Sequence, residues 1–436
     1  MSGLLSGDSK LWLSFMCALV VCALVTPLVI HAARRIGAID APDDERRIHE
    51  RPTPRLGGIA MLVAILGTTA YYVTFSAITT SAVRHLEQII AIMCCAAGVS
   101  LLGAWDDWKG LNWKPKLLGQ VGLAAGAVFA PLLGIATSVR QLILPVKIID
   151  PPFVPAVHLP IWLGAGIAVL SIVALMNMMN FIDGVDGLAA GIAAISSASL
   201  AIIAASYGRG NIAILAASTS GASAGFLIFN FARGGARIFM GDAGSMLLGY
   251  LLATIALQGV LKTTAAVALL IPLALLAVPI LDTLFVVLKR LKHKQSIASA
   301  DKWHLHHRLL NVGYSPRRVT VAFWLWTASL SALALAMRFV NYGNSEQWNT
   351  GGLGVLGIFM AIAVGFTIYL AFVLEIFKTR AVRLRNAGAH LSVVPPVNDA
   401  PDPVNVVDTP VDDDPGSFLG EGHDRAAGIA TDPRDD

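Results

Sequence analysis

The sequence has 436 residues, of which 56% are hydrophobic and 14% are charged. Soluble domains carry about 25% charged residues, so this composition excludes an ordinary soluble fold. The formal net charge is only +4, and the positions of the Lys and Arg residues along the chain are more informative than their sum.

Apolar runs long enough to cross a hydrocarbon core of about 30 Å recur along most of the chain. We therefore predict an all-α polytopic membrane protein with about 11 transmembrane helices. The predicted spans cover 11–31, 57–79, 87–105, 117–135, 160–178, 187–206, 212–231, 243–260, 264–288, 319–340 and 352–377.

The positive charges predict the orientation of these spans, because loops rich in Lys and Arg stay in the cytoplasm. The loops after odd-numbered spans, together with the first residues after the last span, hold 23 of the 32 Lys and Arg residues, and the opposite side holds seven. The N-terminus is therefore expected outside and the C-terminus in the cytoplasm.

The composition changes after Arg385. Prolines alternate there with acidic residues, including the run Asp412-Asp413-Asp414. Such a segment cannot bury enough apolar surface to fold. We predict a multi-pass membrane domain over 1–385 and a disordered, acidic, Pro-rich cytoplasmic tail over 386–436.

Five polar clusters fall on the loops that the charges place in the cytoplasm. Polar and ionisable groups are costly near a bilayer, so clusters at helix ends indicate a functional site. The clusters are Arg46 to Gly58, Asp106-Asp107 with Lys116, Asn177 to Gly187, Met240 to Ser245, and His304 to Arg308.

The aspartates in these clusters predict a metal-dependent phosphoryl-transfer site. Asp106, Asp107 and Asp242 supply oxygen ligands of the kind that Mg²⁺ uses together with substrate phosphates and water. The alternative for Asp106-Asp107 is a helix-capping or loop pair. The alternative for Asp242, which begins a helix between two glycines, is an N-cap.

The remaining clusters predict contacts to substrate. Asn180, Asp183 and Asp186 recur every three residues, so a helical or turn-like segment places them on one face, where they can bind a base or sugar. A polar elbow between two helices is the alternative. The basic stretch 46–55 has the positive-inside flank as its alternative.

The 304–308 segment reads His-Leu-His-His-Arg. Its three histidines and Arg308 offer hydrogen-bond donors for phosphate oxygens. Zinc binding is the competing interpretation, which the lack of Cys ligands and of a partner cluster disfavours.

Five motifs in order carry a resemblance to a known family: RPTPRLGG, GAWDDWKGLNWKPK, NMMNFIDGVDGLAAG, FMGDAGS and HLHHRLL. The chain resembles the polyprenyl-phosphate N-acetylhexosamine-1-phosphate transferases of glycosyltransferase family 4, to which muramoyl-pentapeptide transferase is related. The resemblance runs from about Pro42 to Arg318.

The resemblance implies a role for each cluster. Asp106 and Asp107 match the aspartate pair near the carrier phosphate and the metal, and Asp242 matches the metal ligand. Lys116 matches the lysine that meets the donor diphosphate. The nucleotide-recognising loop corresponds to Asn180, Asp183 and Asp186, and the histidine-rich loop over the sugar phosphate corresponds to His304, His306, His307 and Arg308.

Three further assignments follow from the same resemblance. His306 is predicted to be catalytic, along with Asp106 and Asp107. Arg51, in the RPTPRLGG motif, is assigned to substrate binding. Asp282 matches a family position whose role the sequence leaves open.

The implied reaction moves N-acetylhexosamine-1-phosphate from a UDP-sugar to undecaprenyl or another polyprenyl phosphate, in the bacterial inner membrane with a cytoplasmic active site. UMP leaves, and the product starts a lipid-linked envelope glycan. The expected cofactor is Mg²⁺, or Mn²⁺ in its place. Membrane lipids and no nucleic acid are expected as partners, and a homodimer stays open beside a monomer.

The donor predicted by resemblance is a UDP-N-acetylhexosamine, with UDP-GlcNAc preferred over UDP-MurNAc-pentapeptide. The 304–308 segment and Arg55-Leu56-Gly57-Gly58 resemble the simple-sugar branch of the family. An ion-coupled transporter is the rival class. It explains membrane carboxylates, but a transport path needs polar groups near the midplane rather than at helix ends.

Overall fold

The structure is a computed structural model of the chain. It describes residues 2–40, 52–80, 86–129, 161–259, 267–292, 304–311, 313–341 and 349–386. The predictions for Arg51 and for the tail beyond Asn386 fall outside the described residues.

The described residues form a helical bundle with one short hairpin. The elements are α1 (Ser2–Ile36), β1 (Ile39–Asp40), β2 (Thr53–Pro54), α2 (Gly57–Thr80), α3 (Leu86–Lys109), α4 (Trp113–Phe129), α6 (Ile161–Ile182), α7 (Leu188–Ser206), α8 (Gly210–Asn230), α9 (Gly241–Gly259), α10 (Val267–Leu275), α11 (Ala277–Lys292), α12 (Leu305–Asn311), α13 (Pro316–Phe339) and α14 (Thr350–Asn386). The helices belong to one compact unit, Met1–His390.

Eight of the described helices are long and apolar enough to cross a membrane, namely α1, α2, α3, α6, α7, α8, α13 and α14. The protein is therefore an all-α, multi-pass membrane protein, as the composition predicts. The other three predicted spans fall on α4, on α9 and on the pair α10 and α11. The count of eleven stays a prediction.

The structure corrects two predicted boundaries. The single span predicted over 264–288 is two helices that meet at Leu276, because Pro279 has no N–H to donate to the carbonyl of Leu275. Helix α3 continues to Lys109, so Asp106 and Asp107 lie on its last turn rather than in a loop.

Helix α9 lies at the centre of the bundle. Helices α2, α3, α6, α7 and α8 all pack against it. The side chains of Met246, Leu247 and Tyr250 on α9 are fully buried. Asp242 lies in the first turn of this central helix, so the surrounding helices hold its position.

Small residues let α7 and α8 pack closely. Both helices bury Ala and Ser side chains along their contact. The Ser220 hydroxyl donates across the contact to the Ala194 carbonyl at 2.8 Å, and the Thr219 hydroxyl donates back to the Leu215 carbonyl in its own helix. Buried hydroxyls therefore keep their hydrogen bonds where water is excluded.

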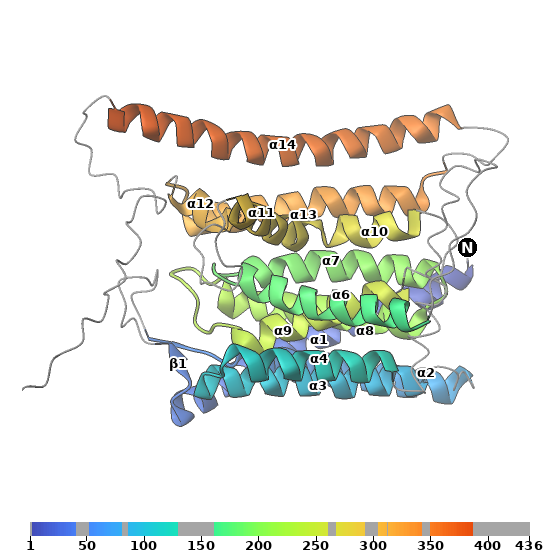
Figure 1. Cartoon of the computed structure of the whole chain (residues 1–436). Coiled ribbons are helices and arrows are strands. Elements are labelled where there is room, and N and C mark those ends of the chain that lie inside the picture. Colours follow the sequence, from blue (N-terminus) through green and yellow to red (C-terminus); the bar gives the residue numbers. More distant parts are fainter. Residues whose placement is uncertain are drawn as a thin grey trace, which may run out of the picture. The chain divides into compact units, whose positions relative to one another are not determined.

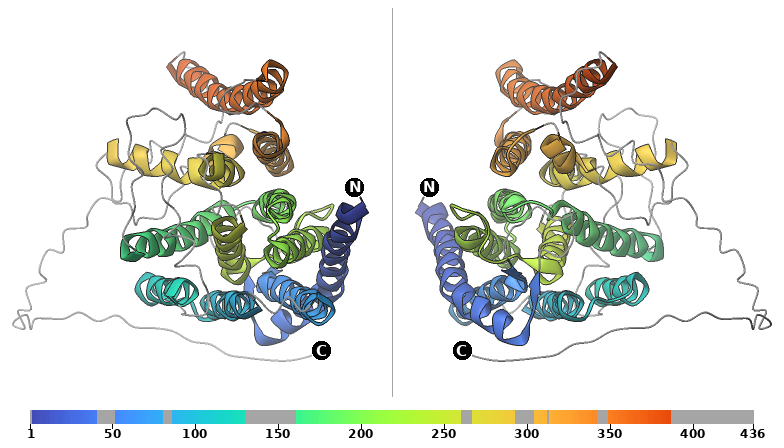
Figure 2. Two further views of the ribbon diagram at one scale, coloured as in Figure 1. Left: turned by 90° about the vertical axis from the view of Figure 1, so that its right-hand side faces the viewer. Right: turned by 90° about the vertical axis from the view of Figure 1, so that its left-hand side faces the viewer.

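The polar loops gather at one end of the bundle. In Figure 1, β1 and α12 lie at the same end, and α1 begins at the opposite end. Figure 2 views the helices end-on, with α14 at one edge beside α13 and with α2, α3 and α4 at the other edge. The residues predicted for the site therefore converge from both halves of the sequence.

Candidate active site

Glycines bring the backbones of three helices together at this end. A Cβ on Gly58 of α2 would lie 2.1 Å from the backbone nitrogen of Gly244 in α9. A Cβ on Gly103 of α3 would lie 2.4 Å from the carbonyl oxygen of Asp242. No larger residue fits at either contact without moving a backbone, which explains the second glycine of the RLGG motif and the glycine that begins the GAWDD motif.

Asp107 of α3 caps the N-terminus of α9. One carboxylate oxygen accepts the backbone N–H of Asp242 at 2.9 Å, and the other accepts that of Ala243 at 3.0 Å. Gly241 precedes them with a φ of 66°, and a Cβ there would lie 2.3 Å from the Asp107 carboxylate. The helix-capping alternative thus holds for Asp107, although the helix that it caps is α9 rather than its own helix α3. Its metal and catalytic roles stay predictions.

Lys116 of α4 lies between two carboxylates from different helices. Its ammonium group forms an ion pair with Asp106 at 2.8 Å and another with Asp242. Asp106 also accepts the backbone N–H of Leu111 at 2.6 Å, which closes the turn between α3 and α4. The predicted lysine therefore joins the two acidic motifs of the site, although they are more than 100 residues apart.

Asn180, at the end of α6, fixes the other side of the Asp242 carboxylate. Its amide donates to Asp242 at 2.7 Å and to the Ser245 hydroxyl at 2.9 Å. One turn deeper, the buried Gln120 of α4 accepts a hydrogen bond from Asn177 at 2.8 Å. The hydrogen bond between Gln120 and Asn177 joins α4 to α6 beneath the site. The Asp242 carboxylate is held by Asn180 and Lys116, and Asp242 lies within the first turn of α9, so the N-cap alternative does not describe it.

Asp186 and Asp183 lie in the turn between α6 and α7. The Asp186 carboxylate accepts the backbone N–H of Ala236 at 2.9 Å, and its carbonyl accepts the Thr320 hydroxyl at 3.0 Å. The side chain of Asn230 accepts the N–H of Gly187 at 2.8 Å, the αL residue before α7. The segment is a polar elbow between two helices, and it also faces the pocket.

Asp183 differs from its neighbours. Within the described part of the chain, no hydrogen bond or ion pair of its carboxylate is found. Burial raises the pKa of Asp183 well above its ordinary value, and the carboxylates of Asp242, Asp107 and Asp186 raise it further. The site therefore contains more negative charge around Asp183 than the described cations neutralise.

Asp282 of α11, whose role the sequence left open, holds the histidine-rich segment. One of its carboxylate oxygens contacts Nδ1 of His304 at 2.7 Å, and the other accepts the backbone N–H of Leu305 at 2.7 Å. The Asp282 side chain is 1% exposed. This buried acid therefore fixes both the His304 ring and the start of α12.

Of the three predicted histidines, only His307 lines the pocket. His306 is fully buried behind it, and neither of its ring nitrogens has a hydrogen-bond partner in the part of the chain that the structure describes. Burial and the neighbouring histidines lower the pKa of His306 well below its ordinary value, so its ring is neutral at pH 7. The side chain of Arg308 points to Phe285, with 4.9 Å to the ring centroid. The catalytic role of His306 stays a prediction.

The hairpin of β1 and β2 contributes two residues that the sequence motifs did not assign to the site. Asp40 pairs with Thr53 in the hairpin, and its carboxylate forms an ion pair with Arg55 at 2.8 Å. The RPTPRLGG motif pointed to this segment. The sequence alone did not distinguish Arg55 from the neighbouring arginines, because all of them can be explained as a basic flank on the cytoplasmic side.

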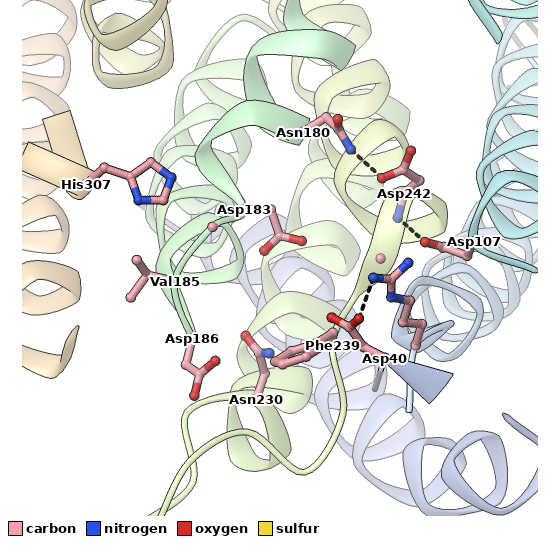
Figure 3. A pocket seen from close by; sticks show the side chains of 13 residues that line it. Asp40, Asp107, Asn180, Asp183, Val185, Asp186, Asn230, Phe239, Asp242 and His307 are labelled. Atoms are coloured by element: carbon pink, nitrogen blue, oxygen red, sulfur yellow. Dashed lines mark hydrogen bonds and ion pairs between the residues drawn. The ribbon is translucent and has the colours of Figure 1, made fainter. Parts of the chain in front are cut away.

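These elements enclose a pocket of about 350 Å³, a size that suits a small ligand. Figure 3 shows its aspartates, which come from β1, the end of α3, the turn between α6 and α7 and the start of α9. The lining residues are Asp40, Arg55, Asp107, Asn180, Asp183, Gly184, Val185, Asp186, Asn230, Phe239, Gly241, Asp242 and His307. Asn230 and Phe239 are further lining residues that the sequence analysis did not assign to the site. Asn230 lies outside the five motifs, and Phe239 begins the FMGDAGS motif but carries no charge.

The donor set of the pocket fits a hard divalent cation. Asp183 has no hydrogen-bond or ion-pair partner for its carboxylate among the described residues, and Asp242 lies nearby. Oxygen ligands of this kind suit Mg²⁺. Among the described residues no group of three or more His, Cys, Asp or Glu side chains forms a ready metal cluster. Mg²⁺ does not require one, because it binds through one or two carboxylates and completes its shell with water and phosphate.

The fold and the site define a multi-pass membrane protein with an acidic pocket at one end of its helices, in which the lining residue Asp242 is joined by Lys116 to Asp106. Lys116 and Asp106 themselves are not among the lining residues. Residues 89–260 match the profile of glycosyl transferase family 4. The chain is 32% identical over 328 residues to a probable undecaprenyl-phosphate N-acetylglucosaminyl 1-phosphate transferase of Bacillus subtilis, covering 75% of this chain and 85% of that protein.

Two other relatives carry related names. A decaprenyl-phosphate N-acetylglucosaminephosphotransferase of Mycobacterium leprae is 32% identical over 370 residues, which cover 78% of this chain and 87% of the relative. An undecaprenyl-phosphate alpha-N-acetylglucosaminyl 1-phosphate transferase of Escherichia coli is 25% identical over 368 residues, with 82% and 91% covered. The chain belongs to the polyprenyl-phosphate N-acetylhexosamine-1-phosphate transferases of glycosyl transferase family 4, and the resemblance of its motifs is confirmed.

Proposed function

We propose that the protein transfers GlcNAc-1-phosphate from UDP-GlcNAc to undecaprenyl or another polyprenyl phosphate and releases UMP. The observation that carries this proposal is the pocket at the end of the bundle, where Lys116 joins Asp106 to Asp242. The names of the relatives support a polyprenyl phosphate as the acceptor and N-acetylglucosamine phosphate as the transferred group. The product starts a lipid-linked glycan of the bacterial cell envelope.

The pocket offers two chemically different regions for the donor. Phe239 and Asp186 supply an aromatic ring and a carboxylate, which suit a base and a ribose, while the Asn230 amide bonds to the backbone of Gly187 and Ile238 behind them. Asp242 and Asp183 supply the oxygens for a metal-bound diphosphate. The nucleoside is therefore placed toward the α8–α9 loop and the diphosphate toward the start of α9.

Asp183 and Asp242 are the residues proposed to hold Mg²⁺. The ion would offset the negative charge that develops on the transferred phosphoryl group. The unpartnered Asp183 supports this assignment. Because folding raises its pKa, Asp183 destabilises the folded protein increasingly as the pH rises above 3.8, and a bound cation reverses that effect.

The residues of this chain act by positioning and by neutralising charge. An oxygen of the polyprenyl phosphate attacks the β-phosphorus, the bond to the bridging oxygen breaks, and UMP leaves with that electron pair. A phosphate monoester has a second pKa of about 6, so the attacking oxygen needs no strong base at neutral pH. Lys116 offsets the negative charge near the start of α9.

The transporter alternative is weaker. The described carboxylates of the pocket come from β1, the end of α3, the turn between α6 and α7 and the start of α9. A transport path requires such groups near the middle of the membrane. We therefore retain the transferase.

Purified protein in detergent is expected to release UMP from UDP-GlcNAc when undecaprenyl phosphate and Mg²⁺ are both added. Chelation by EDTA should stop the reaction, and Mg²⁺ should restore it. Mass spectrometry of the lipid product identifies the transferred sugar. Absence of UMP release from folded protein with all three components would overturn the proposed function.

The same site predicts an effect of Mg²⁺ on stability that does not require turnover. At pH 7.5 the ion should raise the melting temperature, because it binds the folded state only. The shift should shrink strongly in Asp183→Asn, since that variant lacks the unpartnered carboxylate. An equal shift in the variant and the wild type would remove Asp183 from the metal site.

The orientation of the bundle is also proposed: the pocket end faces the cytoplasm. The test uses a variant without the four native cysteines, into which one cysteine is introduced. Ser315→Cys, at the start of α13, should resist a membrane-impermeant thiol reagent in intact cells. Gly210→Cys, at the opposite end of the bundle, should react. The reverse pattern would invert the topology.

Asp282→Asn is expected to lower turnover by roughly 10- to 100-fold. The carboxylate accepts a hydrogen bond from the Nδ1–H of His304, whereas an Asn amide nitrogen at that place donates a hydrogen bond and favours the other His304 tautomer. The amide oxygen can still accept the Leu305 N–H, so α12 keeps its first contact. Rates of UMP release at equal melting temperature test this, and a wild-type rate would exclude a positioning role for Asp282.

A further inference from the structure

Arg55 is placed where an anionic substrate needs a cation. Of the described residues that line the pocket, five are aspartates and only Arg55 has a permanent positive charge. The donor that we propose carries a negatively charged diphosphate. Among the described residues, Lys116 is a second cation near the pocket, and it already forms ion pairs with two carboxylates. Arg55 is therefore the cation best placed to meet the ligand.

The backbone around Arg55 is fixed from both sides. Its N–H donates to the Ala38 carbonyl at 2.9 Å, and the adjacent Pro54 carbonyl accepts the N–H of Phe239 at 2.9 Å. The N–H of Gly57 then donates to the Phe239 carbonyl at 3.0 Å. These bonds join the hairpin to the segment that carries Phe239 and leads into Asp242. The backbone of Arg55 is therefore held in a fixed position relative to Phe239 and Asp242.

Asp40 orients the Arg55 side chain without using all of its donors. The ion pair joins one terminal nitrogen of the guanidinium to one carboxylate oxygen at 2.8 Å, and the Arg55 side chain is 34% exposed. A guanidinium has five N–H donors in a planar fork. The remaining donors suit two phosphate oxygens at once, which an ammonium group cannot match. The dashed line at Asp40 in Figure 3 marks this ion pair.

We propose that Arg55, oriented by Asp40, binds the phosphate groups of the nucleotide donor and sets the affinity of the enzyme for it. This inference rests on the proposed function and adds a residue that neither the metal site nor the histidine segment includes. Arg55 then acts in ground-state binding of the donor, and the polyprenyl phosphate does not depend on it.

The test compares Arg55→Gln, Arg55→Lys and a matched control, Arg35→Gln. Arg35 is exposed in the last turn of α1, just before the hairpin, and does not line the pocket. Arg55→Gln should raise the KM for UDP-GlcNAc by on the order of 10- to 100-fold. Arg55→Lys keeps the charge but loses the fork, so its KM should lie between those of Arg55→Gln and the wild type. Arg35→Gln should match the wild type.

Product inhibition separates a phosphate contact from a general loss of structure. In Arg55→Gln the inhibition constant of UMP should rise with the KM for UDP-GlcNAc, whereas that of uridine should change less than about twofold, because uridine has no phosphate. The KM for polyprenyl phosphate should also stay near the wild-type value. If Arg55→Gln does not fold, the inhibition constants of UMP and uridine are compared in Arg55→Lys instead.

Three results would overturn the inference. They are an unchanged KM for UDP-GlcNAc, an equal loss of affinity for uridine and UMP, or a change confined to the KM for polyprenyl phosphate. These are distinct from failure of the proposed function. If the wild-type protein releases no UMP, both proposals fail. If the wild type is active and Arg55→Gln has the wild-type KM for UDP-GlcNAc, only the role of Arg55 is excluded.

Discussion

Asp242→Asn should lower the rate of UMP release by on the order of 100- to 1,000-fold while the protein stays folded in the membrane. The Asp242 carboxylate accepts from the Lys116 ammonium and from the Asn180 amide on its two oxygens. An Asn side chain has one acceptor oxygen, so its NH₂ group must face one of these donors. The variant thus loses a hydrogen bond, the charge opposite Lys116 and the proposed metal ligand together.

Ser245→Ala is the matched control for this variant. The Ser245 hydroxyl is the second acceptor for Asn180, at 2.9 Å, and its removal leaves both oxygens of Asp242 in place. Its rate should fall by less than about tenfold, the cost of one neutral hydrogen bond. Initial rates of UMP release at saturating Mg²⁺ and equal expression decide the comparison. An Asp242→Asn enzyme as active as Ser245→Ala would remove Asp242 from the mechanism.

Gly58→Ala should prevent the close packing of α2 on α9 and abolish activity along with stability. The added Cβ would lie 2.1 Å from the backbone nitrogen of Gly244. A backbone atom cannot rotate away as a side chain does, so the two helices must separate. Overpacking of this kind typically costs about 1–3 kcal/mol, and the separation would also displace Asp242 in the first turn of α9.

Gly67→Ala, in the same helix, provides the control. A Cβ at Gly67 meets no atom within 4 Å, so the substitution adds no clash. Ala is favoured over Gly in a helix by about 0.8–1.0 kcal/mol, so this variant should be at least as stable as the wild type. Thermal unfolding in detergent, followed by size-exclusion chromatography, measures both variants. Equal melting temperatures for Gly58→Ala and Gly67→Ala would contradict the packing shown for Gly58.

The sequence by itself determined the class of the protein. Long apolar runs must form helices in a membrane, because every backbone group needs a partner there. Successive spans cross the membrane in opposite directions, so the loops after every second span lie on the same side. The polar motifs fall on those loops, and charge and hydropathy are therefore enough to group Asn180, Asp183 and Asp242 in one site. The motifs then identified the family.

Only the tertiary structure decided what each polar side chain contacts. Asp107 caps a helix that begins 134 residues later, and Lys116 reaches Asp242 from a different helix. Asp282 holds His304 across a segment that local sequence patterns do not connect. Periodicity and charge describe one helix at a time, whereas these contacts depend on how separate helices pack against one another, as α3 packs against α9 at Gly103. For the same physical reason the ion pair of Arg55 with Asp40 could be found only from the structure.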